Sequence, residues 1–93
     1  MVSTVVIHST KQACASDQNG EFLVNGPYCS KPIISTGAGD HFNAGFMLGS
    51  MLDLSLEEAL LLGTANSGYY VRNAFSATKE ELCQFIINWS KNL

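Results

Sequence analysis

Six consecutive residues are the best candidates for chemistry in this sequence: Ser35-Thr36-Gly37-Ala38-Gly39-Asp40. Two glycines around a small residue let the backbone turn tightly, so that several N–H groups point outward where a helix begins. The helix dipole adds partial positive charge at the same point. We interpret Gly37, Ala38 and Gly39 as a cradle for an anion such as a phosphate.

Asp40 follows this cradle, inside the first turn of the expected helix. A carboxylate is ionised at neutral pH and would repel a phosphate that came directly to it. Beside the anion, it could instead accept a proton from a hydroxyl that attacks the phosphorus atom. The alternative is that Asp40 only caps a helix that happens to begin with glycines.

Extended segments precede the loop. The residues alternate in polarity or are β-branched in three short stretches, 4–8, 12–16 and 21–24. Turn-forming residues follow the second and third stretches, at 17–20 and 25–27. This pattern predicts three short strands.

Helical spacing replaces this pattern after Gly39. The apolar residues with that spacing are Ala44, Leu48, Met51 and Leu52. Two capping-box patterns then begin further helices, Ser55 with Glu58 and Thr78 with Glu81. Three helices therefore follow three strands, and this order predicts an α/β sandwich or part of one.

The composition limits the choice of function. The 93 residues suffice for one domain at most. Hydrophobic residues make up 46% of the chain and charged residues 14%, against about 25% charged in ordinary soluble domains, so we expect some apolar surface to meet a partner. A net charge of -3 provides no field that attracts nucleic acid, and we expect no nucleic-acid partner.

The sequence also lacks the marks of a membrane or secreted protein. No run approaches the ~20 apolar residues of a membrane span, and no secretion signal is recognisable. We expect a soluble, cytoplasmic chain. Cys14, Cys29 and Cys83 are odd in number and scattered, which fits neither a disulfide framework nor a zinc site, and we expect buried, inert thiols.

A family resemblance lies in the same loop. Thr36-Gly37-Ala38-Gly39-Asp40, followed by Phe42, Asn43, Ala44 and Gly45, resembles the second signature of the ribokinase-like carbohydrate kinases, the phosphofructokinase B type. Three later segments resemble the family's capped helix, its Ala-Asn pair and its next turn: 54–60, 65–66 and 71–72. The resemblance covers essentially the whole chain, but only as the C-terminal part of a longer fold.

This resemblance implies a domain organisation. We expect residues 1–93 to be a single C-terminal fragment of a sugar kinase domain. Its parts would be a strand-rich segment 1–35, a phosphate and catalytic loop 35–40, and a helical segment 40–93.

The resemblance also implies the reaction, which is transfer of the terminal phosphoryl group of ATP, with Mg²⁺, to a sugar or sugar-like hydroxyl. Asp40 matches the family's catalytic base, and the backbone amides of 37–39 match its anion hole. Thr36 would lie near the phosphates and Asn66 near the adenine. For Asn66 the alternative is a helix amide that bonds a neighbouring loop. No residue is assigned to a metal.

The sequence departs from the family pattern at two places. Ile34 stands where the family often has an Asp that helps bind a monovalent cation, which puts a potassium requirement in doubt. The stretch from Thr10 to Ala13 lacks the glycines of the family's nucleotide loop. An altered nucleotide preference, a charge supplied by Lys11 and weakened catalysis are the open interpretations. The rival function is a non-catalytic nucleotide- or anion-binding module, or a regulatory one, derived from such a kinase.

Other candidate residues have ordinary interpretations. We expect His8 to be a hydrogen-bonded loop residue and His41 to lie on a helix surface, although His41 could approach the acceptor or the phosphate. Tyr69 and Tyr70 could stack on adenine, but core packing is the better interpretation. Trp89, with Phe85, is expected to pack the last helix onto the sheet.

The isolated fragment has its own expected properties. Because the acceptor pocket would lie mostly in the missing N-terminal region, we expect the 93-residue chain to be inactive alone. An exposed apolar face and an open sheet edge would favour self-association.

Overall fold

The protein begins with a small antiparallel sheet. A computed structural model describes residues 4–8, 12–18, 20–26 and 29–91. Its three strands, in the order β1-β2-β3, are β1 (Thr4–His8), β2 (Gln12–Asp17) and β3 (Gly20–Asn25). Each strand confirms the sequence prediction to within one residue at either end.

Three helices follow, as predicted: α1 (Ala38–Met51), α2 (Leu56–Asn73) and α3 (Lys79–Lys91). The Ser55 hydroxyl accepts from the Glu58 N–H at 3.1 Å, and the Glu58 carboxylate accepts from the Ser55 N–H at 2.9 Å. Thr78 and Glu81 exchange the same pair of bonds at 3.2 and 2.9 Å. These bonds to the backbone favour the ionised carboxylate, so they lower the pKa of both glutamates. Both predicted capping boxes are confirmed.

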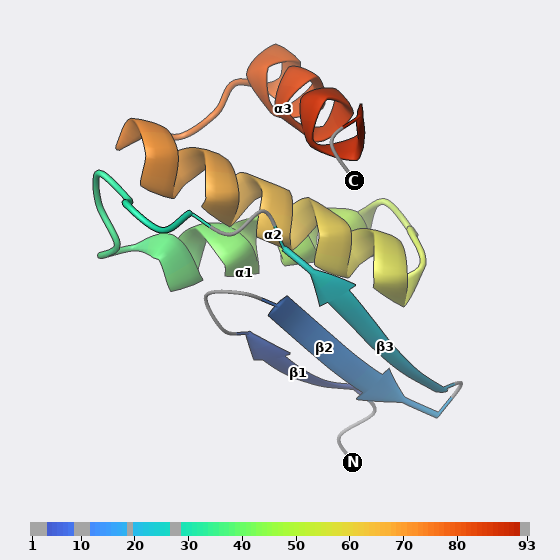
Figure 1. The fold of residues 1–93 in the computed structure, drawn as a ribbon. Coiled ribbons are helices and arrows are strands. Elements are labelled where there is room, and N and C mark those ends of the chain that lie inside the picture. Colours follow the sequence, from blue (N-terminus) through green and yellow to red (C-terminus); the bar gives the residue numbers. More distant parts are fainter. Residues whose placement is uncertain (1–3, 9–11, 19, 27–28, 92–93) are drawn as a thin grey trace.

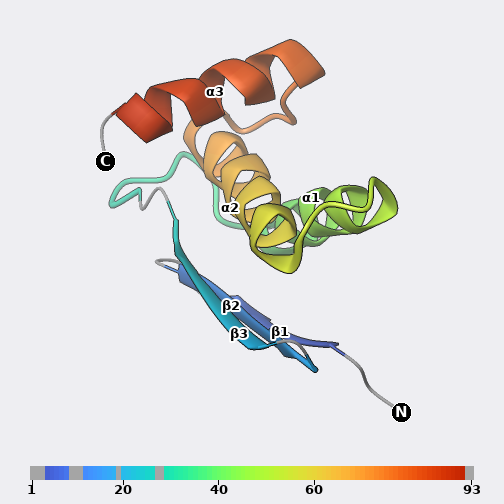
Figure 2. The ribbon, with the colours of Figure 1, turned by 90° about the vertical axis from the view of Figure 1, so that its right-hand side faces the viewer.

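The helices lie on one side of the sheet. α1 and α2 run side by side over one face of the strands, and α3 lies against α2 on the side away from the sheet (Figures 1 and 2). The two central helices approach closely because Gly45 has no side chain. A Cβ atom at Gly45 would lie 2.8 Å from the Leu62 carbonyl oxygen, so any larger residue would push α1 off α2.

The core lies between the sheet and these two helices. Its fully or nearly buried members are Ala13, Ala15, Val24, Phe42 and Leu60. The small alanines of β2 let the helices sit close to the strands, and the largest buried side chains, Phe42 and Leu60, fill the space.

The last helix packs differently from the prediction. Trp89 does contact the core cluster. Phe85, in contrast, packs edge-on against Tyr69 of α2, with ring centroids 5.9 Å apart, and the Arg72 guanidinium lies 5.4 Å from the Phe85 ring centre. The prediction that Phe85 packs onto the sheet is wrong, because its ring contacts side chains of α2 and is not among those packed against the core cluster.

His8 belongs to the core side of the sheet and not to a loop. It ends β1, and its ring stacks on Phe42 with the centroids 4.1 Å apart and the planes 9° from parallel. Burial against this ring disfavours the charged imidazolium and lowers the pKa of His8.

We therefore expect His8 to make the fold less stable in mild acid. The unfolded chain protonates His8 near pH 6.5, whereas the folded chain does so only at lower pH. The unfolded state thus binds more protons as the pH falls below about 7, so the free energy of unfolding decreases. Urea unfolding at about pH 7.5 and pH 5.5 measures this loss, and His8→Phe, which keeps the ring but cannot titrate, should show a smaller one. An equal loss in both chains would contradict the assignment.

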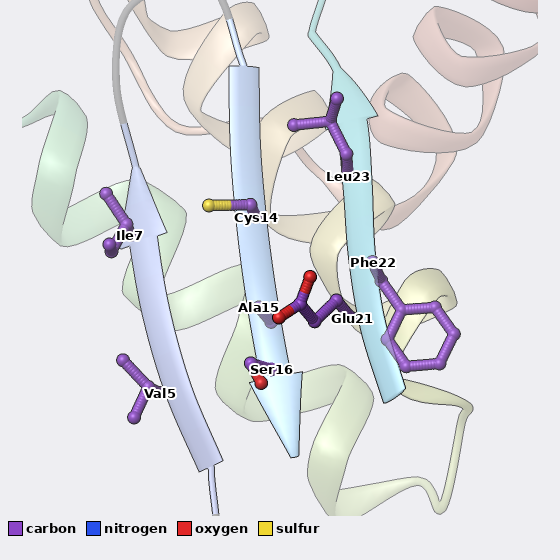
Figure 3. Close-up of a pocket in the computed structure, with 8 residues that line it drawn as sticks. All are labelled: Val5, Ile7, Cys14, Ala15, Ser16, Glu21, Phe22 and Leu23. Atoms are coloured by element: carbon purple, nitrogen blue, oxygen red, sulfur yellow. The ribbon is translucent and has the colours of Figure 1, made fainter. Parts of the chain in front are cut away.

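The other face of the sheet is apolar and uncovered by the described residues. We call the exposed side chains Val5, Ile7 and Leu23 the outer sheet face, and their exposed fractions are 54%, 63% and 55%. Figure 3 shows Val5 and Ile7 on β1 and Leu23 on β3, with the helices behind. They line a shallow depression of about 430 Å³ together with Cys14 and neighbouring residues. Strands that are apolar on both faces are typical of a sheet covered on both sides.

Three further observations concern membranes, metals and thiols. No helix among the described residues has the length and hydropathy to cross a bilayer. Within the same residues, no three His, Cys, Asp or Glu side chains gather as metal ligands do. The cysteines are free, but the expectation that all three are buried is wrong, because Cys83 is exposed on α3 and Cys14 and Cys29 are half-buried.

Candidate active site

The candidate site is the turn that leads into α1. Gly37 is the residue that caps the helix, and its φ of 92° lies in the left-handed region. A side chain there would be strained by this φ and would meet the Tyr70 hydroxyl 3.2 Å from its Cβ atom. The glycine is therefore required by backbone conformation and by space.

The first turn of α1 presents backbone amides without a helical acceptor. The helical ladder begins with the His41 N–H, which donates to the Gly37 carbonyl oxygen at 3.1 Å. The Ala38 N–H donates to the Ser35 carbonyl oxygen at 3.2 Å. The amides of Gly39 and Asp40 have no such partner among the described residues, and the space beside Gly39 is open to 4 Å around a built Cβ atom. Of the predicted cradle, Gly39 is thus the most accessible part and the Ala38 amide is engaged.

Asp40 is exposed in the same turn. The described residues offer its carboxylate no ion pair or hydrogen bond, so it is open to solvent beside the amides of the cradle. The structure brings together the predicted residues 36–40 at one helix end. It leaves Thr36 exposed as well, within the turn.

Asn66 reaches this helix end from α2. Its side-chain Nδ2 donates to the His41 carbonyl oxygen at 2.8 Å. The side chain is half-buried between the two helices. Its amide therefore ties α2 to the first turn of α1, a helix-to-helix contact and not the bond to a loop that the alternative interpretation of Asn66 described.

Two residues at the site differ from their predicted roles. Tyr70 was expected to pack in the core or to stack on adenine. Its hydroxyl instead donates to the Thr36 carbonyl oxygen at 3.0 Å, so it also bonds the backbone of the turn. His41 is half-buried, and its ring stacks on Tyr70 with the centroids 3.7 Å apart and the planes 13° from parallel. One sequence signal could have placed Tyr70 at the site. Tyr70 lies one helical turn after Asn66, on the same face of α2.

The chain entering the site is also attached to α2. The amides of Ile33 and Ile34 both donate to the Val71 carbonyl oxygen, at 2.8 and 3.4 Å. Ile34 stands where the ribokinase-like kinases often have an Asp that helps bind a monovalent cation, and its side chain is half-buried here. Of the predicted altered loop from Thr10 to Ala13, the first two residues lie outside the described residues, and Gln12 and Ala13 belong to β2.

Comparison with known proteins gives consistent matches. A model of the family described as prokaryotic ketohexokinase matches residues 1–89. A ketohexokinase of Haloferax volcanii is 38% identical over 84 residues, which cover 90% of this chain and 22% of that protein. The chain therefore spans about a fifth of the length of this curated relative.

Solved structures share the fold. A nucleoside kinase of Methanocaldococcus jannaschii, described as an archaeal member of the ribokinase family, matches 92% of this chain and 30% of its own, with a TM-score of 0.81 and 20% identity. A putative ribokinase II from E. coli, in its apo form, matches 94% of this chain and 30% of its own, with a TM-score of 0.83 and 23% identity. The predicted ribokinase-like α/β fold is confirmed.

Proposed function

Because the chain belongs to the prokaryotic ketohexokinase family, we propose that it is the C-terminal part of a kinase that transfers the terminal phosphoryl group of ATP to a sugar hydroxyl. The observation that carries this proposal is the exposed first turn of α1, where the Asp40 carboxylate lies beside amides that have no helical acceptor. Such a helix end attracts the charge that builds up on a phosphoryl group in transfer.

In this mechanism Asp40 is the general base. The acceptor oxygen forms a bond to the γ-phosphorus of ATP, and the bond from that phosphorus to the bridging oxygen breaks, so ADP leaves. The proton of the acceptor hydroxyl passes to the Asp40 carboxylate. The amides of Gly37, Ala38 and Gly39 would stabilise the transferring group. The Ala38 N–H would then donate both to this group and to the Ser35 carbonyl oxygen.

Thr36 and Asn66 are proposed to contact the nucleotide. The exposed Thr36 precedes the cradle directly and would lie near the phosphates. Asn66 uses one N–H of Nδ2 to bond the His41 carbonyl oxygen. Its Oδ1 could accept from the adenine amino group, and its second N–H could donate to a ring nitrogen.

The side chains of this chain fit a magnesium ion that arrives with ATP. Mg²⁺ in kinases is held by phosphate oxygens, water and one or two carboxylates and not by a cage of protein ligands. The exposed Thr36 hydroxyl and the exposed Asp40 carboxylate are the side-chain oxygens next to the cradle along the chain, and Asp40 serves as the base, so phosphate oxygens and water would supply most of the ligands. When bound, the ion neutralises charge on the phosphates.

A ketohexose is the proposed acceptor, since the curated relative is a ketohexokinase. The test is to incubate the intact parent with ATP and with ketohexoses, aldoses or nucleosides, and to identify the phosphorylated product by mass spectrometry. A ketohexose phosphate as the main product supports the proposal. Preferential phosphorylation of a nucleoside would overturn the acceptor class and keep the kinase chemistry.

We also propose that the isolated 93-residue chain self-associates through its outer sheet face. A second copy would remove Ile7 and Leu23 from water, and β1 is an edge strand in the described sheet. Light scattering should find dimers or larger species, and the double substitution Ile7→Lys and Leu23→Lys should restore the monomer. Ile87→Lys, at an exposed apolar position on α3, is the matched control. A monodisperse monomer of the unsubstituted chain at high concentration would rule this association out.

A further inference from the structure

We propose that His41 and Tyr70 are positioning residues that hold the Thr36–Gly37 turn in the conformation that presents the anion cradle. This inference rests on the proposed kinase function. Neither side chain is placed to react, and both act through the backbone of the turn that precedes Gly39 and Asp40.

The two carbonyl groups of the turn each receive a side-chain donor. The Tyr70 hydroxyl donates to the Thr36 carbonyl oxygen at 3.0 Å. The Nδ1 of His41 lies 2.9 Å from the Gly37 carbonyl oxygen. Because a carbonyl oxygen can only accept, Nδ1 carries the proton and donates. Together these bonds fix the orientation of two successive peptide planes.

The donors are themselves held in place. The stacked rings of His41 and Tyr70 restrict each other's rotation. The Nε2 of His41 lies 2.8 Å from the Ser76 hydroxyl, which donates to it when Nδ1 carries the proton. We call His41 and Tyr70, with these hydrogen bonds, the clamp. The clamp connects the start of α1 to α2 and to the segment between α2 and α3.

The turn needs this support because it has little of its own. Gly37 adopts the left-handed conformation with φ 92°, and no side chain caps α1. A glycine has more backbone conformations available than any other residue. Without the clamp, the peptide planes before Gly39 would sample other orientations, and the cradle amides would point at the transferring phosphoryl group for less of the time.

The test compares two neighbouring tyrosines in the intact parent. Tyr70→Phe removes the hydroxyl that bonds Thr36 and keeps the ring that stacks on His41. Tyr69→Phe is the matched control, because its ring packs against Phe75 and Phe85 away from the turn. We expect Tyr70→Phe to lower kcat about 10-fold, with the KM for the acceptor unchanged, since small misplacements of catalytic groups cost rate. Tyr69→Phe removes a hydroxyl that bonds Glu81 on α3 and does not contact the turn, so it should leave kcat within about 2-fold.

His41 provides a rescue experiment. His41→Leu removes both hydrogen bonds of the ring and should lower kcat about 10- to 100-fold. His41→Asn keeps an N–H donor close to the position of Nδ1 and should recover part of that rate. Combined with Tyr70→Phe, His41→Leu should cost less than the product of the two single effects, because both act on the same turn.

A second measurement separates the clamp from the kinase proposal. Amide hydrogen exchange of the peptide 33–42 in the intact parent should be faster in Tyr70→Phe and unchanged in Tyr69→Phe. If the parent phosphorylates nothing but this exchange pattern holds, the clamp stands and the kinase function fails. If Tyr70→Phe and His41→Leu keep full kcat, or if their exchange is unaltered, the clamp is overturned.

Discussion

Asp40→Asn is expected to lower kcat of the intact parent kinase about 10²- to 10⁴-fold, which is the usual contribution of a positioned general base. Asparagine keeps the size and shape of the side chain but cannot take the proton of the acceptor hydroxyl. Affinity for ATP should be nearly unchanged, since an exposed carboxylate beside an anion site does not hold the phosphates. Steady-state kinetics and calorimetric titration with a non-hydrolysable ATP analogue measure the two quantities.

The matched control for this substitution is Asp53→Asn. Asp53 is also exposed, lies just beyond the other end of α1 and has a φ of 59°, which asparagine tolerates. The substitution Asp53→Asn removes the same charge far from the cradle and should leave kcat within about 2-fold. Normal phosphoryl transfer by Asp40→Asn would show that Asp40 only caps the helix.

Phe42→Ala is expected to destabilise the fold by about 3–5 kcal/mol, as truncation of a buried aromatic ring does. Phe42 is only 2% exposed. Its ring stacks on His8 of β1, and the ring centroid of Phe46 lies 6.1 Å from its own. Phe42 therefore joins α1 to the sheet two residues from Asp40. Domains of this size are stable by about 5–15 kcal/mol in total, so this loss would leave a chain that is marginal or unfolded.

Urea unfolding followed by circular dichroism measures this loss. Phe75→Ala provides the comparison, because Phe75 is 53% exposed and its truncation should cost about 1 kcal/mol or less. A cost below about 1 kcal/mol for Phe42→Ala would mean that α1 is not anchored to the sheet through this ring.

Local sequence patterns predicted the elements well. The capping boxes at Ser55 and Thr78 are confirmed because each needs only residues three positions apart. The strands are confirmed because the turn-forming residues at 17–20 are a local signal. The loop 35–40 is predictable for the same reason, since its glycines and Asp40 lie within four consecutive residues, 37–40.

Contacts between distant residues could not be predicted in this way. The bond from Tyr70 to Thr36 joins residues 34 positions apart, and the bond from His41 to Ser76 joins residues 35 apart. These contacts depend on how α1 packs on α2, which the close approach at Gly45 decides. No pattern within one helix reports that packing, so His41 was predicted to lie on a helix surface.

The most direct test of the central claim is ATP-dependent formation of a sugar phosphate by the intact parent, with the 93-residue chain assayed beside it. We expect turnover by the parent and none by the chain alone, because the chain would carry the base and the cradle without the acceptor pocket. A parent that binds nucleotide but phosphorylates no sugar or nucleoside would contradict the account and favour a non-catalytic nucleotide-binding or regulatory module.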